Sequence, residues 1–263
     1  MLDSIKKIFH RTTQDTRMAV AAIRREYTGE PLTEDQTNPD PFVQFETWFG
    51  EAVRLSTFDP SAMFLATASA GEPEPLAATG KSVEPDRVNR PGNPVPGTTD
   101  HTTTANHLSV SGRVVLLKGY DERGFVFYTH YESRKGMQLA LNPRASLTFY
   151  WPEMVRQVCI EGFALRISAE ESDAYFDSRP AGSRISAIAS PQSRTVHGRS
   201  ELEARADTVR KGGNLARPEN WGGYRLCPDR IEFWQGRPNR LHDRILFTRQ
   251  SDDSPWNMER LAP

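Results

Sequence analysis

Residues 145–167 read ASLTFYWPEMVRQVCIEGFALRI and hold the strongest structural signal in the chain. Residues 145–151 and 156–167 are rich in β-branched and aromatic side chains, which favour strands. Only the short segment 152–155 joins them, whereas parallel strands need a crossover of about a dozen residues or more. The stretch therefore predicts an antiparallel hairpin and argues against a Rossmann fold.

The same composition recurs on both sides of this hairpin. Before it, strands are predicted at 62–67, 113–120 and 124–130, and a turn at 121–124 joins the last two. After it, the strand pattern returns in YRLCP (224–228), IEFWQG (231–236) and DRILFTRQ (243–250). So many closely joined strands predict one antiparallel barrel or sandwich with a single core.

Helix signals lie between these strands, so we expect a mainly β fold with flanking helices. One helix is predicted over 15–27. Further helices are predicted to start at the N-cap Asp40 with Pro41 after it, at a capping box of Ser168 with Glu171 and at a second capping box of Ser200 with Glu203, and the last of these helices is predicted to end at 212–213. We expect an N-terminal helical segment at 1–39 and the barrel domain at 40–263. The segment 80–108 has four prolines, repeated threonines and few large apolar side chains, which predicts a disordered or loosely held insert.

Composition limits the classes of function. The 263 residues carry 33 Lys and Arg against 34 Asp and Glu, so a broad basic surface for nucleic acid or anionic membrane is not expected. No run of about 18 apolar residues occurs, which argues against a membrane span. Cys159 and Cys227 fit no metal-ligand spacing and no disulfide framework, and we expect no metal. We expect a cytoplasmic protein, with mitochondrial import as the less favoured alternative because Asp3 and Asp15 interrupt the basic N-terminus.

The run WQGRPNRLHDR, residues 234–244, is the strongest local signal for chemistry. Arg240, His242 and Arg244 have a spacing of two, which on a strand would direct all three side chains to one face. Such a face suits an anion or an electron-rich ring. The alternative interpretation is an ordinary solvated strand face.

Two further clusters are suited to phosphate. Arg113 and Lys118 bracket one predicted strand, and Arg134 and Lys135 follow Ser133 at a predicted helix start. Charged strand ends and helix-surface residues are the alternative here.

Tyr175, Arg179 and Ser183 recur every four residues and would share a helix face, unless Pro180 ends the helix first. An amphipathic surface helix is the alternative, and Gln192 with Ser193 forms a weaker signal still. Motifs for triphosphate hydrolysis, zinc hydrolysis and serine acyl transfer are absent from the sequence. The clusters therefore indicate two phosphate sites.

Several stretches together form one ordered pattern. They are RREY (24–27), RVVLLKG (113–119), FYTHYESRKG (127–136), NPRASLTFYW (142–151), RQVCIEG (156–162), YFDSRP (175–180), PQS (191–193), WGGYR (221–225), IEFWQG (231–236), NRLHDR (239–244) and ERLAP (259–263). In this order they resemble the pyridoxamine 5'-phosphate oxidase family over most of the chain outside the insert. The resemblance implies an antiparallel FMN-binding split β-barrel and a homodimer with each flavin bound where two subunits meet.

The resemblance also implies roles for individual residues. FMN would be held by Arg113, Val114, Val115, Leu116, Tyr128, Thr129, Arg134, Lys135, Gln157, Gln192, Ser193, Trp234 and Arg244. The substrate phosphate would be held by Lys118, Tyr175, Arg179 and Ser183. Arg240 and His242 would lie over the substrate ring as the catalytic pair, and Arg24 to Tyr27 would fold across the site as a lid.

The implied activity is FMN-dependent oxidation of pyridoxamine 5'-phosphate and pyridoxine 5'-phosphate to pyridoxal 5'-phosphate, with O2 reduced to H2O2. Because a flavin performs the redox step, the absence of a catalytic triad from the sequence is expected. The alternative is a non-catalytic protein of the same barrel fold that binds FMN or pyridoxal phosphate. Loss of Lys118, Arg240 or His242 would favour that alternative, and all three are present.

Overall fold

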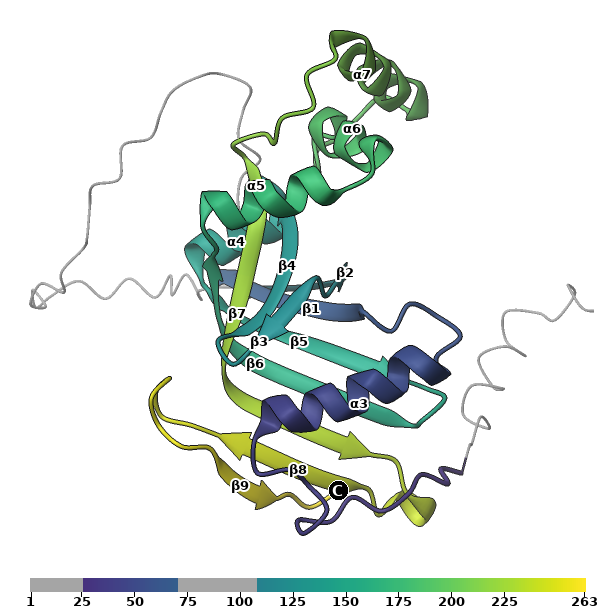
Figure 1. Ribbon diagram of the computed structural model, residues 1–263, viewed down its shortest axis with the longest axis vertical. Coiled ribbons are helices and arrows are strands. Elements are labelled where there is room, and N and C mark those ends of the chain that lie inside the picture. Colours follow the sequence, from purple (N-terminus) through teal and green to yellow (C-terminus); the bar gives the residue numbers. More distant parts are fainter. Residues whose placement is uncertain (1–25, 71–107) are drawn as a thin grey trace, which may run out of the picture.

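The structure is a computed structural model that describes residues 26–70 and 108–263. Its described part is built on one antiparallel sheet flanked by helices, as predicted (Figure 1). The strands are β1 (Ala62–Ala70), β2 (Leu108–Leu116), β3 (Gly119–Asp121), β4 (Gly124–His130), β5 (Arg144–Trp151), β6 (Arg156–Arg166), β7 (Trp221–Gln235), β8 (Asp243–Thr248) and β9 (Asn257–Arg260). The helices are α3 (Pro41–Leu55), α4 (Arg134–Leu141), α5 (Ala169–Ser178), α6 (Ala181–Ala189), α7 (Arg199–Gly212) and the short 3-10 helix η1 (Pro238–Arg240).

The sheet is organised around the long strand β7. The main path runs β2-β1-β5-β6-β7-β4-β3, and every pairing in it is antiparallel. On one edge β7 pairs with β6 along its length, with a register shift between Glu161 and Gly162. On the other edge its first half pairs with β4 and its second half with β8. One strand therefore connects the β4 region to the β8 region, and the two predicted strands 224–228 and 231–236 are in fact continuous.

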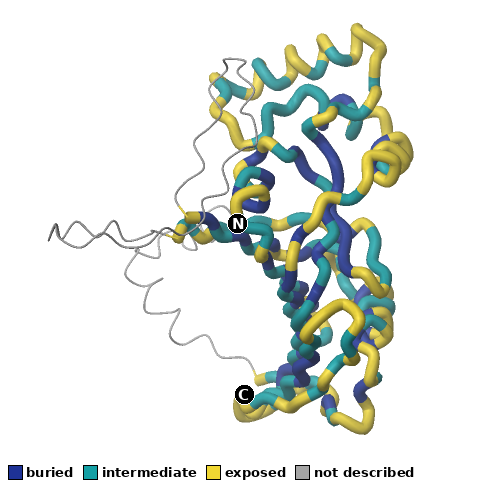
Figure 2. Tube along the Cα trace, turned by 90° about the vertical axis from the view of Figure 1, so that its left-hand side faces the viewer, coloured by how far each residue is buried: buried dark blue, intermediate teal, exposed yellow. Residues whose placement is uncertain are grey.

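The main core lies between the sheet and α3. Asp40 caps α3 by accepting a hydrogen bond from the Phe42 backbone N–H at 2.8 Å, and Pro41 follows, as predicted. Phe45 on this helix is fully buried, and its ring centroid lies 4.8 Å from that of Phe125 on β4 and 5.2 Å from that of Phe149 on β5. Figure 2 shows the buried positions concentrated along the strands. A smaller second cluster joins Phe176, Ala187 and Trp221 beneath α5 and α6.

The helix boundaries confirm one predicted capping box and correct the other. Ser168 and Glu171 make both reciprocal hydrogen bonds at the start of α5. The box of Ser200 with Glu203 is wrong, because the helix begins two residues earlier than that box requires: α7 starts at Arg199, with Gly198 as its N-cap. At this end of the helix the carboxylate of Glu201, and not that of Glu203, accepts a hydrogen bond from the His197 backbone N–H at 2.9 Å.

Two other boundaries differ from the prediction. β2 begins at Leu108, so the last residue of the predicted insert belongs to a strand, and the predicted strand 113–120 is divided between β2 and β3. The rest of the insert lies outside the described residues, as does most of the predicted helix 15–27, whose last two residues are not helical. Within the described ranges, no helix is long and apolar enough to cross a membrane.

Candidate active site

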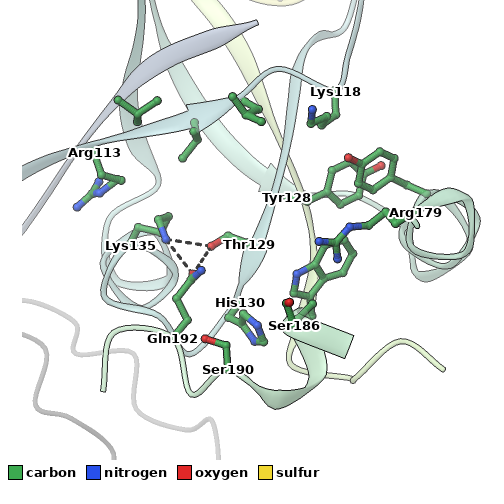
Figure 3. A pocket seen from close by; sticks show the side chains of 16 residues that line it. Arg113, Lys118, Tyr128, Thr129, His130, Lys135, Arg179, Ser186, Ser190 and Gln192 are labelled. Carbon is green, nitrogen blue, oxygen red and sulfur yellow. Dashed lines mark hydrogen bonds between the residues drawn. The ribbon is translucent and has the colours of Figure 1, made fainter. Parts of the chain in front are cut away.

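A cavity of about 460 Å³ opens where β2 and β4 meet α4, α5 and α6 (Figure 3). Many of the predicted ligand-binding residues line it: Arg113, Val114, Val115, Leu116, Lys118, Tyr128, Thr129, Lys135, Tyr175, Arg179 and Gln192. Its remaining lining was not predicted: His130, Ser186, Ala187, Ser190 and Trp221. Trp221 is the first residue of the stretch WGGYR, one of those that resemble the family, so the resemblance could have indicated this residue although its chemistry alone did not.

Lys135 is held at one side of the cavity, and no acidic side chain in the described part of the chain pairs with it. Ser133 caps α4 through its side chain, which directs the first turn of the helix towards the cavity. Lys135 Nζ donates hydrogen bonds to Thr129 Oγ1 at 3.1 Å and to Gln192 Oε1 at 2.9 Å, the triangle drawn in Figure 3. Burial, reinforced by the nearby Arg113 charge, lowers the pKa of Lys135 to about 8. An anion in this position would restore the usual preference for the charged amine.

Arg113 lies beside Lys135, and its hydrogen-bond acceptors in the described structure are also uncharged. Its guanidinium donates to Thr67 Oγ1 at 2.7 Å, to the Leu65 carbonyl at 3.2 Å and to Gln138 Oε1 at 3.2 Å. Burial lowers the pKa of Arg113, and repulsion by Arg134 adds to that shift. Two cations held by neutral acceptors form a suitable cradle for a dianion.

Arg179 is a second cationic side chain of the cavity, across from Arg113 and Lys135, and Lys118 lines the same cavity on the far side of Tyr128 from Arg179 (Figure 3). Its guanidinium carbon lies 4.9 Å from the centroid of the Trp221 ring, and its Nη1 atom is buried with no hydrogen-bond partner in the described structure. The rings of Tyr128 and Tyr175 stack nearby with centroids 3.9 Å apart. Burial, and secondly Tyr175, raise the pKa of Tyr128 to about 12, so its hydroxyl stays protonated. Arg179 is therefore available for another anion.

Ser183 does not join Tyr175 and Arg179 on one helix face. α5 ends at Ser178, Arg179 is its C-cap, and Pro180 is the N-cap of α6, the outcome that the sequence left open. Ser183 is half-buried on α6 and is not part of the cavity lining, whereas Ser186 on the same helix is.

A second group of predicted residues lies around the start of β8, outside the cavity lining. The Trp234 and His242 ring centroids are 4.8 Å apart, and Tyr27 lies 5.5 Å from His242. Arg240 lies over the Tyr27 ring, with its guanidinium carbon 5.4 Å from the centroid. His242 Nδ1 accepts a hydrogen bond from the Arg237 backbone N–H, which leaves Nε2 as the protonated nitrogen of the neutral ring. Burial, and secondly Arg240, lower the pKa of His242 and favour that neutral form.

The expectation that Arg240, His242 and Arg244 share one strand face is wrong. β8 begins only at Asp243, and Arg240 ends the helix η1 with a φ of 65°. Pro238 starts that turn with its restricted φ, and the chain then passes through left-handed backbone before the strand can form. Sheet register instead places Trp234 opposite Gln157 on β6 and opposite Arg244 on β8, so these three side chains share a face.

The remaining predicted residues have less defined surroundings. Arg134 is exposed at the start of α4, and its guanidinium donates to Ser109 Oγ at 3.4 Å. Ser193 is exposed next to Gln192 with a φ of 72°. Arg24 lies outside the described residues. Among the described residues no cluster of His, Cys, Asp and Glu could hold a metal ion.

The sequence matches two family models and many relatives. The model described as pyridoxamine 5'-phosphate oxidase matches residues 101–211, and the model of the pyridoxine 5'-phosphate oxidase C-terminal dimerisation region matches residues 221–263. A pyridoxine/pyridoxamine 5'-phosphate oxidase of Burkholderia orbicola is 48% identical over 93% of this chain and 99% of its own length. The corresponding protein of Paraburkholderia phytofirmans is 46% identical over the same shares.

Two solved structures are similar in fold. PhzG from Burkholderia lata, crystallised with tetrahydrophenazine-1-carboxylic acid, has a TM-score of 0.69 and 28% identity and covers 90% of this chain and 100% of its own. A pyridoxamine 5'-phosphate oxidase-related, FMN-binding protein from Nostoc punctiforme has a TM-score of 0.58 and 17% identity, over 85% of this chain and 98% of its own. The antiparallel FMN-binding split barrel is confirmed, and the cofactor is FMN. The chain belongs to the pyridoxamine 5'-phosphate oxidase family.

Proposed function

We propose that this protein oxidises pyridoxamine 5'-phosphate and pyridoxine 5'-phosphate to pyridoxal 5'-phosphate. The observation that carries the proposal is that one cavity is lined by separate cationic groups: Arg113 beside Lys135 at one side, and Arg179 and, apart from it, Lys118 elsewhere in the lining. A flavin phosphate needs one such group, and a phosphorylated substrate needs another. When bound, FMN would supply the two-electron redox chemistry, with O2 as the final acceptor and H2O2 as its product. For the amine substrate, water would replace the nitrogen, which is released as ammonia.

In this proposal the protein binds and orients the reactants. Arg113, Lys135 and Gln192 hold the flavin phosphate, with Val114, Val115, Leu116, Tyr128, Thr129, Arg134 and Ser193 along the flavin. Lys118, Tyr175, Arg179 and Ser183 hold the substrate phosphate. With the phosphate fixed, the substrate carbon is presented to the flavin in one orientation, which is how positioning accelerates a reaction.

We further propose that the β8 group acts in the cavity of a second subunit of a homodimer. Trp234, Arg240, His242 and Arg244 all fall in the region matched by the dimerisation model. β2 carries exposed Val110 and, where it lines the cavity, exposed Val114, apolar side chains that a partner would cover. Gln157, Trp234 and Arg244 would then contact the flavin, and Arg240 with His242 would lie over the substrate ring.

The N-terminal segment 1–39 is proposed as the lid of that composite site. Its Tyr27 packs against Trp234 and His242, which supports a position over the substrate. For Arg24 the proposal rests on the resemblance alone. We place the enzyme in the cytoplasm, in keeping with two free cysteines.

One assay tests the activity. The purified protein should be yellow and should form aldehyde and H2O2 in equal amounts from pyridoxine 5'-phosphate, and pyridoxine without the phosphate is the matched control. Equal rates with and without the phosphate would contradict the assignment of Arg179. Bound flavin with no peroxide from either substrate would favour the non-catalytic alternative.

A second candidate is a phenazine-type oxidase. The similarity to PhzG over the whole of that chain favours testing it. Tetrahydrophenazine-1-carboxylic acid therefore belongs in the same assay. Faster turnover of this compound than of the two vitamin phosphates would replace the proposed substrates.

A further inference from the structure

Gln138 on α4 is completely buried and is hydrogen-bonded to Arg113, one of the two cations at that side of the cavity. Its Oε1 atom accepts hydrogen bonds from Thr67 Oγ1 at 2.7 Å, Ser111 Oγ at 2.8 Å and Arg113 Nη2 at 3.2 Å. One amide oxygen is therefore shared by three donors from β1 and β2. Gln138 itself is not part of the cavity lining.

The two hydroxyl groups link Gln138 to Arg113 in a defined direction. Thr67 and Ser111 are direct partners in the β1–β2 register. Each donates its proton to Gln138 and accepts a hydrogen bond from Arg113, at 2.7 Å for Thr67 and 2.5 Å for Ser111. This arrangement holds the guanidinium at both terminal nitrogens, and it requires an oxygen of Gln138 at the shared position.

A carboxylate would satisfy this position better than the amide does if stability alone mattered. Gln138 Nε2 is buried and has no hydrogen-bond partner in the described structure, which costs free energy. Glutamate has the same shape, leaves no donor unsatisfied and would pair with Arg113. It would also neutralise the charge that Arg113 offers to the cavity. Every hydrogen-bond acceptor of Arg113 and Lys135 in the described structure is instead uncharged.

We infer that Gln138 is a positioning residue of the flavin-phosphate site, which orients Arg113 through an uncharged acceptor so that its positive charge stays available to the phosphate. This inference rests on the proposed assignment of Arg113 to the FMN phosphate. It extends the site by a layer of residues, Gln138 with Thr67 and Ser111, that do not line the cavity.

The test compares Q138E and Q138M with the matched control Q44E in the full-length protein. Gln44 is also a buried glutamine, 5% exposed, whose Oε1 accepts one backbone hydrogen bond, but it lies on α3. Each protein is stripped of flavin and titrated with FMN and with riboflavin, which lacks the phosphate, by following the quenching of flavin fluorescence. Thermal unfolding of the stripped proteins is measured in parallel.

We expect Q138E to raise the FMN dissociation constant about tenfold or more while its stripped form unfolds at the same or a higher temperature than wild type. Q138M, which removes the acceptor without adding charge, should raise the FMN constant by a smaller factor. Q44E should leave FMN binding unchanged, and no variant should change riboflavin binding. A role in folding alone would lower the unfolding temperature of Q138E instead of raising it.

Unchanged FMN binding by Q138E would overturn the inference, as would an equal loss for riboflavin or a failure of Q138E to fold. These outcomes are distinct from failure of the underlying assignment. If the wild-type protein binds FMN no more tightly than riboflavin, the proposed phosphate site itself is wrong. If wild type prefers FMN and Q138E does so equally, only the role of Gln138 is wrong.

Discussion

Arginine and lysine side chains have neutral hydrogen-bond partners in one half of the candidate site and carboxylate partners in the other. In the cavity, Arg113 and Lys135 have only neutral acceptors in the described structure, and burial lowers the pKa of both. Around β8, Arg244 makes a two-pronged ion pair with Glu232 at 2.8 and 3.0 Å. Nearby, Arg260 pairs with both Glu34 and Asp243 at 2.8 Å.

The pKa directions follow from this difference. Hydrogen bonding to Glu232 raises the pKa of Arg244, and hydrogen bonding to Glu34 raises that of Arg260. Glu34, a partner of Arg260, responds in the opposite sense, and its pKa falls to about 2, chiefly through its hydrogen bond with Arg260. A carboxylate partner offsets the cost of holding a cation in the folded chain, whereas unpaired buried cations cost stability until an anion binds. The comparison therefore favours the cavity, and not the larger number of arginines near β8, as the proposed anion site.

The largest effect should come from Lys135→Met, which removes one unpaired cation with little change in shape. We expect the free energy of FMN binding to weaken by about 3 kcal/mol, roughly a hundredfold in the dissociation constant, because a buried charge-assisted contact is lost. The stripped protein should become more stable, since the desolvation cost of the amine disappears. Fluorescence titration and thermal unfolding measure the two quantities, and a less stable stripped protein would contradict the comparison.

Arg240→Leu tests the β8 half by a different readout. Its proposed contact is with the substrate ring, so flavin content should stay at the wild-type level while kcat/KM for pyridoxine 5'-phosphate falls by about tenfold to a hundredfold. The flavin absorbance of the purified variant is the internal control. Loss of flavin together with activity would place Arg240 at the cofactor.

Arg244→Trp tests whether a paired arginine can also bind the flavin. We expect FMN binding to weaken by about 1.5 kcal/mol, at the lower end for a contact to a charged group, because Glu232 already engages part of the guanidinium. Glu232→Gln is the companion variant, which frees Arg244 and should tighten FMN binding. An unchanged FMN dissociation constant in both variants would remove Arg244 from the flavin site.

The sequence was sufficient for the strands because their signals are local. Residues 124–130 are bounded by a turn and rich in aromatic side chains, and β4 has the predicted limits. Arg240 shows the opposite case: a spacing of two predicted one strand face, but Pro238 and the left-handed backbone after it determine the conformation. Periodicity is informative only within a continuous element.

Periodicity along the sequence could not predict the hydrogen bonds that join Arg113 to Thr67, Ser111 and Gln138. Thr67, Ser111 and Gln138 are ordinary polar residues far apart in the chain, and each would be read as solvent-exposed by itself. Only the β1–β2 register and the packing of α4 on β1 bring them together. The same holds for Trp221, which contacts Arg179 only after β7 returns to α5 from a distant part of the chain.

The smallest expected effect is a pH dependence that arises from Lys135 alone. Its pKa is lowered from 10.5 to about 8, so above pH 8 the folded chain without flavin holds fewer protons than the unfolded chain. Stability of that form should therefore rise with pH between about 8 and 10.5. FMN binding has the opposite sign, because the phosphate prefers the protonated amine. Affinity should fall about twofold between pH 7 and 8 and about tenfold by pH 9, while the phosphate, with a second pKa of about 6, stays a dianion throughout. Lys135→Arg keeps its charge over this range and should remove the decline. A decline that persists in Lys135→Arg would assign the titration to another group and leave Lys135 no different from the paired cations around β8.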